Sequence, residues 1–277
     1  MDGRQPTPLG LGQVRLLQGV KILGLYPPPA REVSAVYEDL VLPPAGRREG
    51  ARPYVITNTV SSVDGRTTMG GKAAGIGSRT DRRTMRTLRS KVDAVMIGAG
   101  TLRAEKLSLG LDGPDSLPQP LAIIVTDSGD VPLEEHLIVE EGQDVLILLS
   151  NAAPGRVAER LRALAPVVKA PADSSTGAVD LEEAMRILEA ERGVESLLVE
   201  GGPALNHALF SRNLVDELFL TVAPELLGGS AERTLTLLRG PALPARDRPT
   251  LDLASIHLSG GELFLRYSIM RTGSRTS

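Results

Sequence analysis

Two glycine-containing segments of this 277-residue chain have residue types suited to binding phosphate. Residues 98–101 (Gly-Ala-Gly-Thr) and residues 200–203 (Glu-Gly-Gly-Pro) each follow a short apolar run that is typical of a buried strand. Glycine lets a backbone approach a phosphate closely, and Thr101 adds a hydroxyl donor. Pro203 is typical of the first turn of a helix, whose free N–H groups and dipole favour a diphosphate. The two segments therefore predict a phosphate or nucleotide site.

The same two segments also fit a purely structural explanation. A strand that turns directly into a helix often needs glycine and proline only for a tight connection. Neither segment matches the G-x-G-x-x-G fingerprint or the P-loop pattern. A third polar strand end, at Asp127 and Ser128, would lie at the same edge of a parallel sheet, where ligands of such sheets bind. From the glycines alone, the binding and the structural explanations both stay open.

Three further side chains near these segments have more than one explanation. Glu200 ends an apolar strand, where a carboxylate is costly to bury without a partner. It could bind an amino-pyrimidine ring or merely cap its own turn. Asp64 precedes Gly65 and could be an ordinary turn residue. His207, on the helix after the glycines, is expected at the surface rather than in catalysis.

Composition excludes several classes of protein. The net charge of −3, the 3% aromatic content and the absence of tryptophan argue against a nucleic-acid partner. The chain has no cysteine, which excludes disulfides and thiolate metal sites. Its histidines, at positions 136, 207 and 257, lack metal-ligand spacing, so we expect no metal. No apolar run could span a bilayer and no leader-like segment opens the chain, so we expect no membrane contact and a cytoplasmic location.

Short apolar runs alternate with amphipathic segments from residue 54 onward. The pattern predicts strands at 54–62, 93–97, 121–126, 145–149, 167–168, 196–199 and 217–222. It predicts helices from a cap at Ser78 or Thr80 to about 91, around 157–164, from a cap at Asp180 through 188, and around 205–209. Apolar strands that alternate with helices predict a mostly parallel sheet covered on both faces. Residues 250–257 and 262–270 alternate as an antiparallel pair at its edge.

The first 52 residues differ from the rest of the chain. They contain proline clusters and a charged, glycine-bearing stretch at 46–52, with short apolar pieces between them. We interpret residues 1–52 as an N-terminal extension that packs on the body in pieces or is partly disordered. Residues 53–277 are expected to form one α/β domain, a size that can bury a sizeable core.

Six blocks in order give the chain a specific resemblance. They are 61–67 (Ser-Ser-Val-Asp-Gly-Arg-Thr), 84–89 leading to 93–101, 125–128 (Val-Thr-Asp-Ser), 199–205 (Val-Glu-Gly-Gly-Pro-Ala-Leu), 214–218 (Leu-Val-Asp-Glu-Leu), and 223–224 with 227–229. Together they resemble the reductase domain of the riboflavin-biosynthesis deaminase/reductase, a dihydrofolate-reductase-like fold. The resemblance covers about residues 53–270. It implies a three-layer α/β fold with a mostly parallel central sheet and an antiparallel C-terminal edge.

The resemblance also implies a function and a set of site residues. The family reduces the ribosyl group of a phosphoribosylamino-pyrimidine to a ribityl chain, with NADPH as hydride donor, and usually forms a homodimer. By position, Arg89, Glu200 and Asp64 would meet the substrate, and Ser128 would lie where the ribose 2′-phosphate is bound. The positions that would line the NADPH site are Gly98, Gly100, Thr101, Glu105, Ser128, Gly201, Gly202, Pro203, Ala204, Leu205, Asn206, His207 and Ala208.

The chain departs from the family pattern on the substrate side. Asp112 stands where the family often has an arginine that holds the substrate phosphate, although Glu105 could replace an aspartate of the same block. A tryptophan common before the Arg89 helix is also missing. Arg103 and Lys106 are candidates for a shifted phosphate contact. The chain could therefore reduce the pathway pyrimidine, reduce another small heterocycle or carbonyl compound, or bind a nucleotide without turnover.

Overall fold

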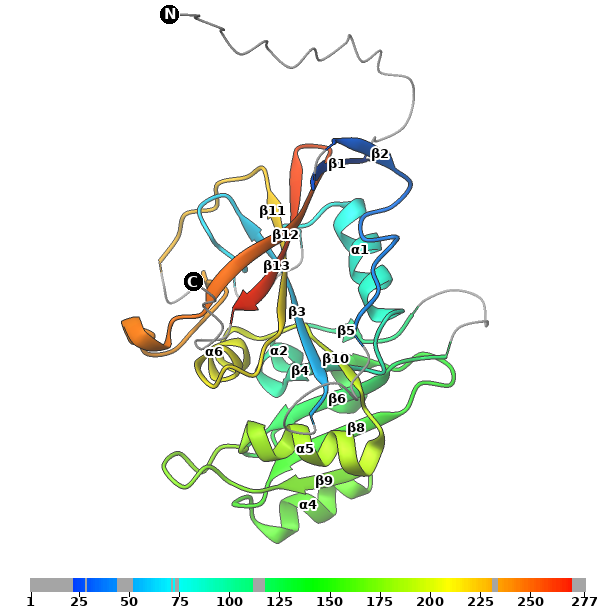
Figure 1. Ribbon diagram of the computed structural model, residues 1–277. Coiled ribbons are helices and arrows are strands. Elements are labelled where there is room, and N and C mark those ends of the chain that lie inside the picture. The colour runs from blue at the N-terminus through cyan, green and yellow to red at the C-terminus, as the bar shows by residue number, and fades with distance from the viewer. Residues whose placement is uncertain are drawn as a thin grey trace, which may run out of the picture.

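A twisted sheet of eleven strands runs through the part of the chain that the structure describes (Figure 1). The computed structural model describes residues 22–27, 29–43, 52–70, 72, 75–111, 118–230 and 234–270. The strand order is β2-β1-β12-β13-β11-β3-β10-β4-β6-β8-β9. The strands are β1 (Ile22–Tyr26), β2 (Arg31–Val33), β3 (Tyr54–Ser62), β4 (Ala94–Gly98), β6 (Leu121–Thr126), β8 (Val145–Ser150), β9 (Val167–Ala170), β10 (Ser196–Val199), β11 (Glu217–Ala223), β12 (Thr250–Ser259) and β13 (Glu262–Met270). A separate parallel pair joins β5 (Leu107–Ser108) to β7 (Leu137–Ile138).

Seven neighbouring strands pair in parallel, namely β11, β3, β10, β4, β6, β8 and β9. On the other side of β11, the strands β13, β12, β1 and β2 pair antiparallel. Parallel strands are buried on both faces and therefore consist of continuous apolar runs. The central strand β4 shows this pattern, because its residues 94–97 are all buried. The mostly parallel sheet with an antiparallel C-terminal edge confirms the predicted architecture.

Helices cover both faces of the sheet and complete three layers. They are α1 (Arg79–Arg89), α2 (Ala99–Ala104), α3 (Leu133–His136), α4 (Gly155–Arg162), α5 (Leu181–Arg192) and α6 (Pro203–Ser211). One apolar core joins the sheet to α1, α2, α3 and α4, with Leu88, Leu102 and Leu161 fully buried. A second core lies on the opposite face, where Met185 of α5 and Leu209 of α6 are fully buried.

The predicted helix caps at Ser78 and Asp180 are confirmed. The Ser78 hydroxyl accepts hydrogen bonds from the backbone N–H groups of Thr80 and Asp81. The Asp180 carboxylate does the same for Glu182 and Glu183 at the start of α5. Such caps satisfy N–H groups that have no partner inside the helix, and this local requirement explains why the sequence predicts where α1 and α5 begin.

Two local features differ from the predictions. Leu164 was expected on the buried face of a helix, but α4 ends at residue 162 and Leu164 is 44% exposed. Pro166 explains this, because proline disfavours helical geometry in the residue before it. No helix was predicted at residues 98–101, but Gly98 is the N-cap of the short helix α2 and the next three residues form its first turn.

The segment before residue 44 adds two strands to the sheet. In Figure 1 the dark blue strands β1 and β2 lie at the top, where β1 pairs with β12. Tyr37, further along this segment, is 4% exposed and packs edge-on against Phe219 and His257. These contacts attach residues 22–43 to the body. The domain division at residue 52 stays a prediction.

No helix within the described ranges is long and apolar enough to cross a membrane.

Candidate active site

The two glycine-containing segments meet at one edge of the sheet. The backbone N–H of Gly98 donates to the carbonyl oxygen of Gly201 at 2.8 Å, which joins the end of β4 to the end of β10. Helix α6 begins immediately after, with Pro203 in its first turn. Proline lacks an N–H and has a helical φ, so it opens a helix without cost. The free N–H groups at the start of this nine-residue helix face the same edge.

Local geometry explains why glycine stands at positions 201 and 202. A Cβ added at Gly202 would lie 2.7 Å from Oγ1 of Thr101, closer than a real Cβ contact permits. A Cβ at Gly98 would meet Leu205 at 3.7 Å, an ordinary contact distance, so packing alone does not require glycine there. Gly201 has a φ of +101°, in the region that favours glycine. The backbone of Gly201 and Gly202 and the Thr101 hydroxyl thus form a glycine cradle in front of α6, which a side chain at position 202 would fill. The N–H and hydroxyl donors of this cradle suit a diphosphate.

Glu200 forms a buried ion pair with Arg89, 111 residues earlier in the chain. Nε of Arg89 donates to Oε1 of Glu200 at 2.8 Å, and Nη2 donates to Oε2 at 2.7 Å. The two side chains are only 6% and 10% exposed. Arg89 also donates to the carbonyl oxygens of Gly110 and Ser108, at 2.8 and 2.9 Å. The guanidinium therefore fixes Glu200 at the end of β10 and ties it to the strand β5 region.

Asn58 of β3 is a candidate site residue that the sequence alone did not indicate. It is half-buried and lies in register beside Phe219 of β11. Val199 pairs with Thr57, so Glu200 and Asn58 are lateral neighbours on adjacent strands. Because side chains alternate along a strand, Asn58 shares the α1 face of the sheet with Ile56. Asparagine is uncommon in strands, but a single polar residue in a β-rich run does not indicate what it binds, and only the strand register brings it to Glu200.

Asp81 is a second residue without a sequence signal, because an aspartate in the first turn of a helix is ordinary. It is half-buried and accepts a hydrogen bond from the Thr221 hydroxyl of β11. Burial, together with the negative charges of Glu262 and Glu200, raises the pKa of the Asp81 carboxyl to about 6. The Thr221 hydrogen bond and the positive charge of Arg82 oppose that shift.

A basic pocket of about 380 Å³ lies at the carboxyl end of β6. Ser128, Asp130, Arg156, Val157 and Arg160 line it. Arg160 donates to the carbonyl oxygen of Gly129 at 2.6 Å, which holds its guanidinium at this strand end. The arginines come from α4, 28 or more residues after Ser128, so the local sequence around Ser128 does not reveal them. Ser128 was predicted at a phosphate site, and the structure adds the positive charges of two arginines and the negative charge of Asp130 around it.

Asp64 lies at the end of β3 and binds a neighbouring loop. Its carboxylate accepts hydrogen bonds from the Ser62 hydroxyl at 2.5 Å and from the N–H groups of Leu227 and Gly228 at 3.1 and 2.7 Å. The Ser62 hydroxyl bond and the two backbone bonds lower the pKa of Asp64 to about 2. This carboxylate holds the loop after β11. Its predicted substrate contact stays a prediction.

The other predicted positions lie along α2 and α6. Asn206 is buried and donates to the carbonyl oxygen of Leu237 at 3.3 Å, while the ring of His207 contacts Pro241 at 2.8 Å. Glu105 caps the end of α2 and is half-buried. Among the remaining α6 positions, Ala204 is exposed, and Leu205 and Ala208 are half-buried.

Of the two basic candidates for the substrate phosphate, one already has a protein partner. Arg103 donates to the carbonyl oxygen of Asp130 at 2.6 Å, and Lys106 is exposed. Asp112, at the position of the family arginine, lies outside the described residues.

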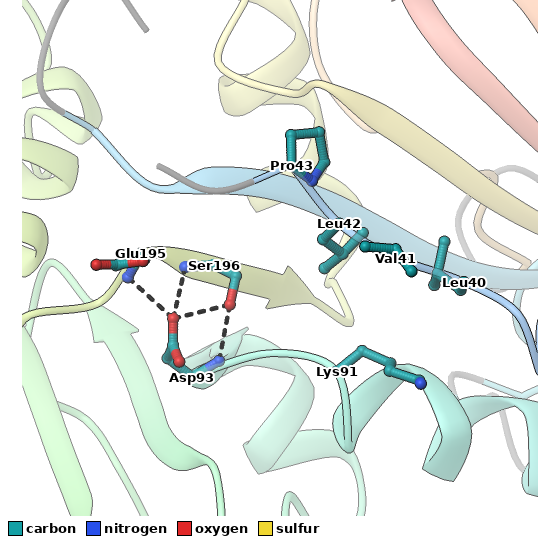
Figure 2. A pocket seen from close by; sticks show the side chains of 8 residues that line it. All are labelled: Leu40, Val41, Leu42, Pro43, Lys91, Asp93, Glu195 and Ser196. Atoms are coloured by element: carbon teal, nitrogen blue, oxygen red, sulfur yellow. Dashed lines mark hydrogen bonds between the residues drawn. The ribbon is translucent and has the colours of Figure 1, made fainter. Parts of the chain in front are cut away.

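A second pocket, of about 370 Å³, lies at the opposite edge of the sheet (Figure 2). Leu40, Leu42 and Lys91 help to line it, together with Asp93 and Ser196 at the amino ends of β4 and β10. Figure 2 shows the Asp93 carboxylate turned toward the start of β10, where it accepts from the N–H and hydroxyl of Ser196, both at 2.8 Å. Asp93 thus joins two strands and is remote from the glycine cradle.

In the described ranges, no group of three or more His, Asp or Glu side chains could hold a metal ion.

Comparisons with known proteins identify the family to which the chain is similar. The family model described as "RibD C-terminal domain" matches residues 53–264. The 2,5-diamino-6-ribosylamino-4(3H)-pyrimidinone 5′-phosphate reductase of Methanothermobacter thermautotrophicus is 32% identical over 220 residues, covering 79% of this chain and 99% of the relative. A reductase of the same name from Archaeoglobus fulgidus is 31% identical, covering 66% of this chain and 86% of the relative.

Solved structures show the same fold. Acinetobacter baumannii RibD has a TM-score of 0.64 at 22% identity, over 79% of this chain and 58% of that chain. This chain thus spans little more than half of that RibD. The riboflavin biosynthesis reductase of Saccharomyces cerevisiae has a TM-score of 0.61 at 19% identity, over 82% of this chain and 94% of that chain. The resemblance noted in the sequence is confirmed, and the chain belongs to the RibD C-terminal domain family.

Proposed function

We propose that this chain uses NADPH to reduce 2,5-diamino-6-ribosylamino-4(3H)-pyrimidinone 5′-phosphate, converting its ribosyl group to a ribityl chain. Family membership makes the chain an oxidoreductase of the pyrimidine reductase type. The observation that carries the proposal is the meeting of the glycine cradle and the Arg89–Glu200 pair at one sheet edge. A phosphate-binding cradle beside a fixed carboxylate suits a nucleotide cofactor next to a nitrogen-rich ring.

The described residues fit NADPH in two places. The backbone of Gly201 and Gly202, the Thr101 hydroxyl and the N–H groups at the start of α6 would hold the diphosphate. The ribose 2′-phosphate would enter the pocket of Ser128, where Arg156 and Arg160 would neutralise its charge. When bound, NADPH supplies a hydride, and the protein supplies alignment and charge.

On the substrate side, Glu200 and Asn58 would recognise the ring. A carboxylate accepts from amino and ring N–H groups, and a carboxamide can both donate and accept. Arg89 would act mainly as a positioning residue, since Glu200 and two carbonyl oxygens bind its guanidinium. Lys106 is the better candidate for the substrate phosphate, because Arg103 contacts Asp130. A homodimer and a cytoplasmic location remain predictions.

The direct test is an assay with this pyrimidinone phosphate and NADPH. The loss of NADPH absorbance should match the appearance of a product two hydrogens heavier than the substrate, identified by mass spectrometry. We expect turnover with NADPH and slower turnover with NADH. Absence of product with this substrate, alongside turnover of another heterocycle or carbonyl compound, would favour a reductase of different specificity.

The substitution Glu200→Gln tests in this assay whether the Glu200 charge recognises the substrate. Gln retains the shape but loses the charge, and a hydrogen bond to a charged group contributes about 1.5–3 kcal/mol. We therefore expect kcat/KM to fall about 10- to 100-fold while NADPH affinity is kept. An equal loss of cofactor affinity would instead assign Glu200 to the cofactor site.

Replacing both Arg156 and Arg160 with glutamine should remove the preference for NADPH over NADH. Two charge-assisted hydrogen bonds to the 2′-phosphate would be lost, so NADPH affinity should fall at least about 100-fold. NADH lacks this phosphate, so its affinity should stay the same. Cofactor fluorescence titrations measure both affinities. Arg162→Gln, an exposed arginine of the same helix outside the pocket, is the control, and equal weakening of both cofactors would refute the assignment.

A further inference from the structure

The Asp81 carboxylate lies over the carboxyl ends of β3 and β11. Its partner Thr221 pairs with Val60 of β3 and stands two residues beyond Phe219. Phe219 belongs to the core beneath α1, so strand alternation puts Thr221 on the same face of the sheet. Glu200 ends on this face too, and its charge acts on Asp81. Asp81 and the Arg89–Glu200 pair therefore face the same side of the candidate active site.

Several groups from other elements surround Asp81. Glu262 of β13 accepts from the N–H of Ser78 at 2.9 Å and also binds its hydroxyl, and its negative charge acts on Asp81. Gly77 presses against the carboxylate so closely that a Cβ there would overlap Asp81. The phenol of Tyr37 is buried, has no hydrogen-bond partner among the described residues, and is acted on by the charge of Asp81.

Other polar side chains near this edge are already engaged. Both oxygens of Glu200 accept from Arg89, which keeps that carboxylate an acceptor. Asp64 accepts three hydrogen bonds, and its pKa of about 2 leaves it without a proton at neutral pH. His207 points to Pro241. Asp81 differs because burial between negative neighbours favours its protonated form, with Arg82 as the opposing charge.

We propose that Asp81 is the general acid of the reductase reaction and donates its proton to the ring oxygen of the substrate ribose. The role rests on the proposed function. As the C1′–O4′ bond breaks, O4′ takes the Asp81 proton and the nitrogen lone pair forms a C=N bond to C1′. The hydride then adds to C1′, and the C=N electrons return to nitrogen. Asp81 regains a proton from water, so one hydride and one proton are consumed in each turnover.

The first test is the pH dependence of kcat and KM for three proteins. Since the acid must be protonated, wild-type activity should fall as the pH rises through about 6. Asp81→Asn should lower kcat about 100-fold or more and remove this pH dependence, while NADPH affinity and KM change little. Thr221→Val removes a hydrogen bond that lowers the pKa, so its activity should fall at higher pH than that of the wild type. Asp252→Asn, at an exposed position of β12, is the control.

The second test measures the carboxyl without turnover. Carbon-13 NMR of aspartate-labelled protein, with no cofactor or substrate added, should show one carboxyl titrating near pH 6 that Asp81→Asn lacks. If the wild type is active and the Asp81→Asn variant keeps the wild-type kcat and pH profile, the general-acid role of Asp81 is overturned while the proposed function stands. Absence of such a titration would overturn that role as well. A wild type that does not reduce the pyrimidinone would overturn the proposed function, and the role of Asp81 with it.

Discussion

Gly202→Val is expected to abolish NADPH binding while the chain remains folded. A Cβ at this position would lie 2.7 Å from Oγ1 of Thr101, and the two methyl groups beyond it would fill the space in front of α6. A diphosphate could then no longer reach the N–H groups at the start of that helix. We expect the affinity to fall at least about 100-fold, which corresponds to about 2.7 kcal/mol. Fluorescence titration with NADPH measures the loss, and circular dichroism checks the fold.

Gly24→Ala on β1 is the matched control. The nearest atoms would lie 3.6 Å from its new Cβ, an ordinary contact distance, and β1 is outside the candidate site. Its NADPH affinity should equal that of the wild type. A folded Gly202→Val protein that still binds NADPH with unchanged affinity would show that the diphosphate lies elsewhere and that the cradle is only a tight connection.

Arg89→Met should lower the free energy of unfolding by about 3–5 kcal/mol. Removing one partner of a buried ion pair leaves the other charge without compensation, and here Glu200 is only 10% exposed. The carbonyl oxygens of Ser108 and Gly110 would lose a donor at the same time. Urea denaturation at fixed pH measures the change through the midpoint and slope.

Arg31→Met provides the comparison for this loss. Arg31 pairs with Asp39 at 2.7 Å, but the two side chains are 64% and 66% exposed. Exposed pairs contribute about 1 kcal/mol or less, so this variant should be nearly as stable as the wild type. Equal effects of the two substitutions would mean that solvent compensates Glu200 and that the Arg89 contact does not stabilise the fold.

Local sequence patterns predicted most of the strands and helices. Ser78 and Asp180 announce their helices because a cap depends only on neighbouring residues. Apolar runs such as residues 121–125 identify the parallel strands because burial on both faces favours apolar side chains at nearly every position. The short helix α2 escaped prediction, since its glycine-rich start is as typical of a loop. Leu164 shows the limit of periodicity, which continued past the point where Pro166 stops the helix.

The candidate site was harder to predict, because its residues meet only through the sheet. Glu200 was recognised as a buried carboxylate that needs a partner, and Arg89 was proposed separately for the substrate. Their direct contact, across 111 residues, follows from how α1 packs on β10. Neither Asn58 nor Asp81 was identified from the sequence, because a single polar residue in a strand or in the first turn of a helix does not by itself indicate a function. Resemblance to a family identifies single positions, but the charges that the fold brings around them come from segments distant in the sequence.

The strands before residue 44 also affect how the molecule behaves at high concentration. Without β1, the Ile256–Ser259 end of β12 would present unpaired N–H and C=O groups along an open edge. Such edges are templates on which another chain can add a strand and begin to aggregate. Here β1 pairs with that end, and the sheet finishes at β2, which is three residues long and includes Arg31 and Glu32. A short charged edge is a poor template for such pairing, which disfavours the addition of a further strand at β2.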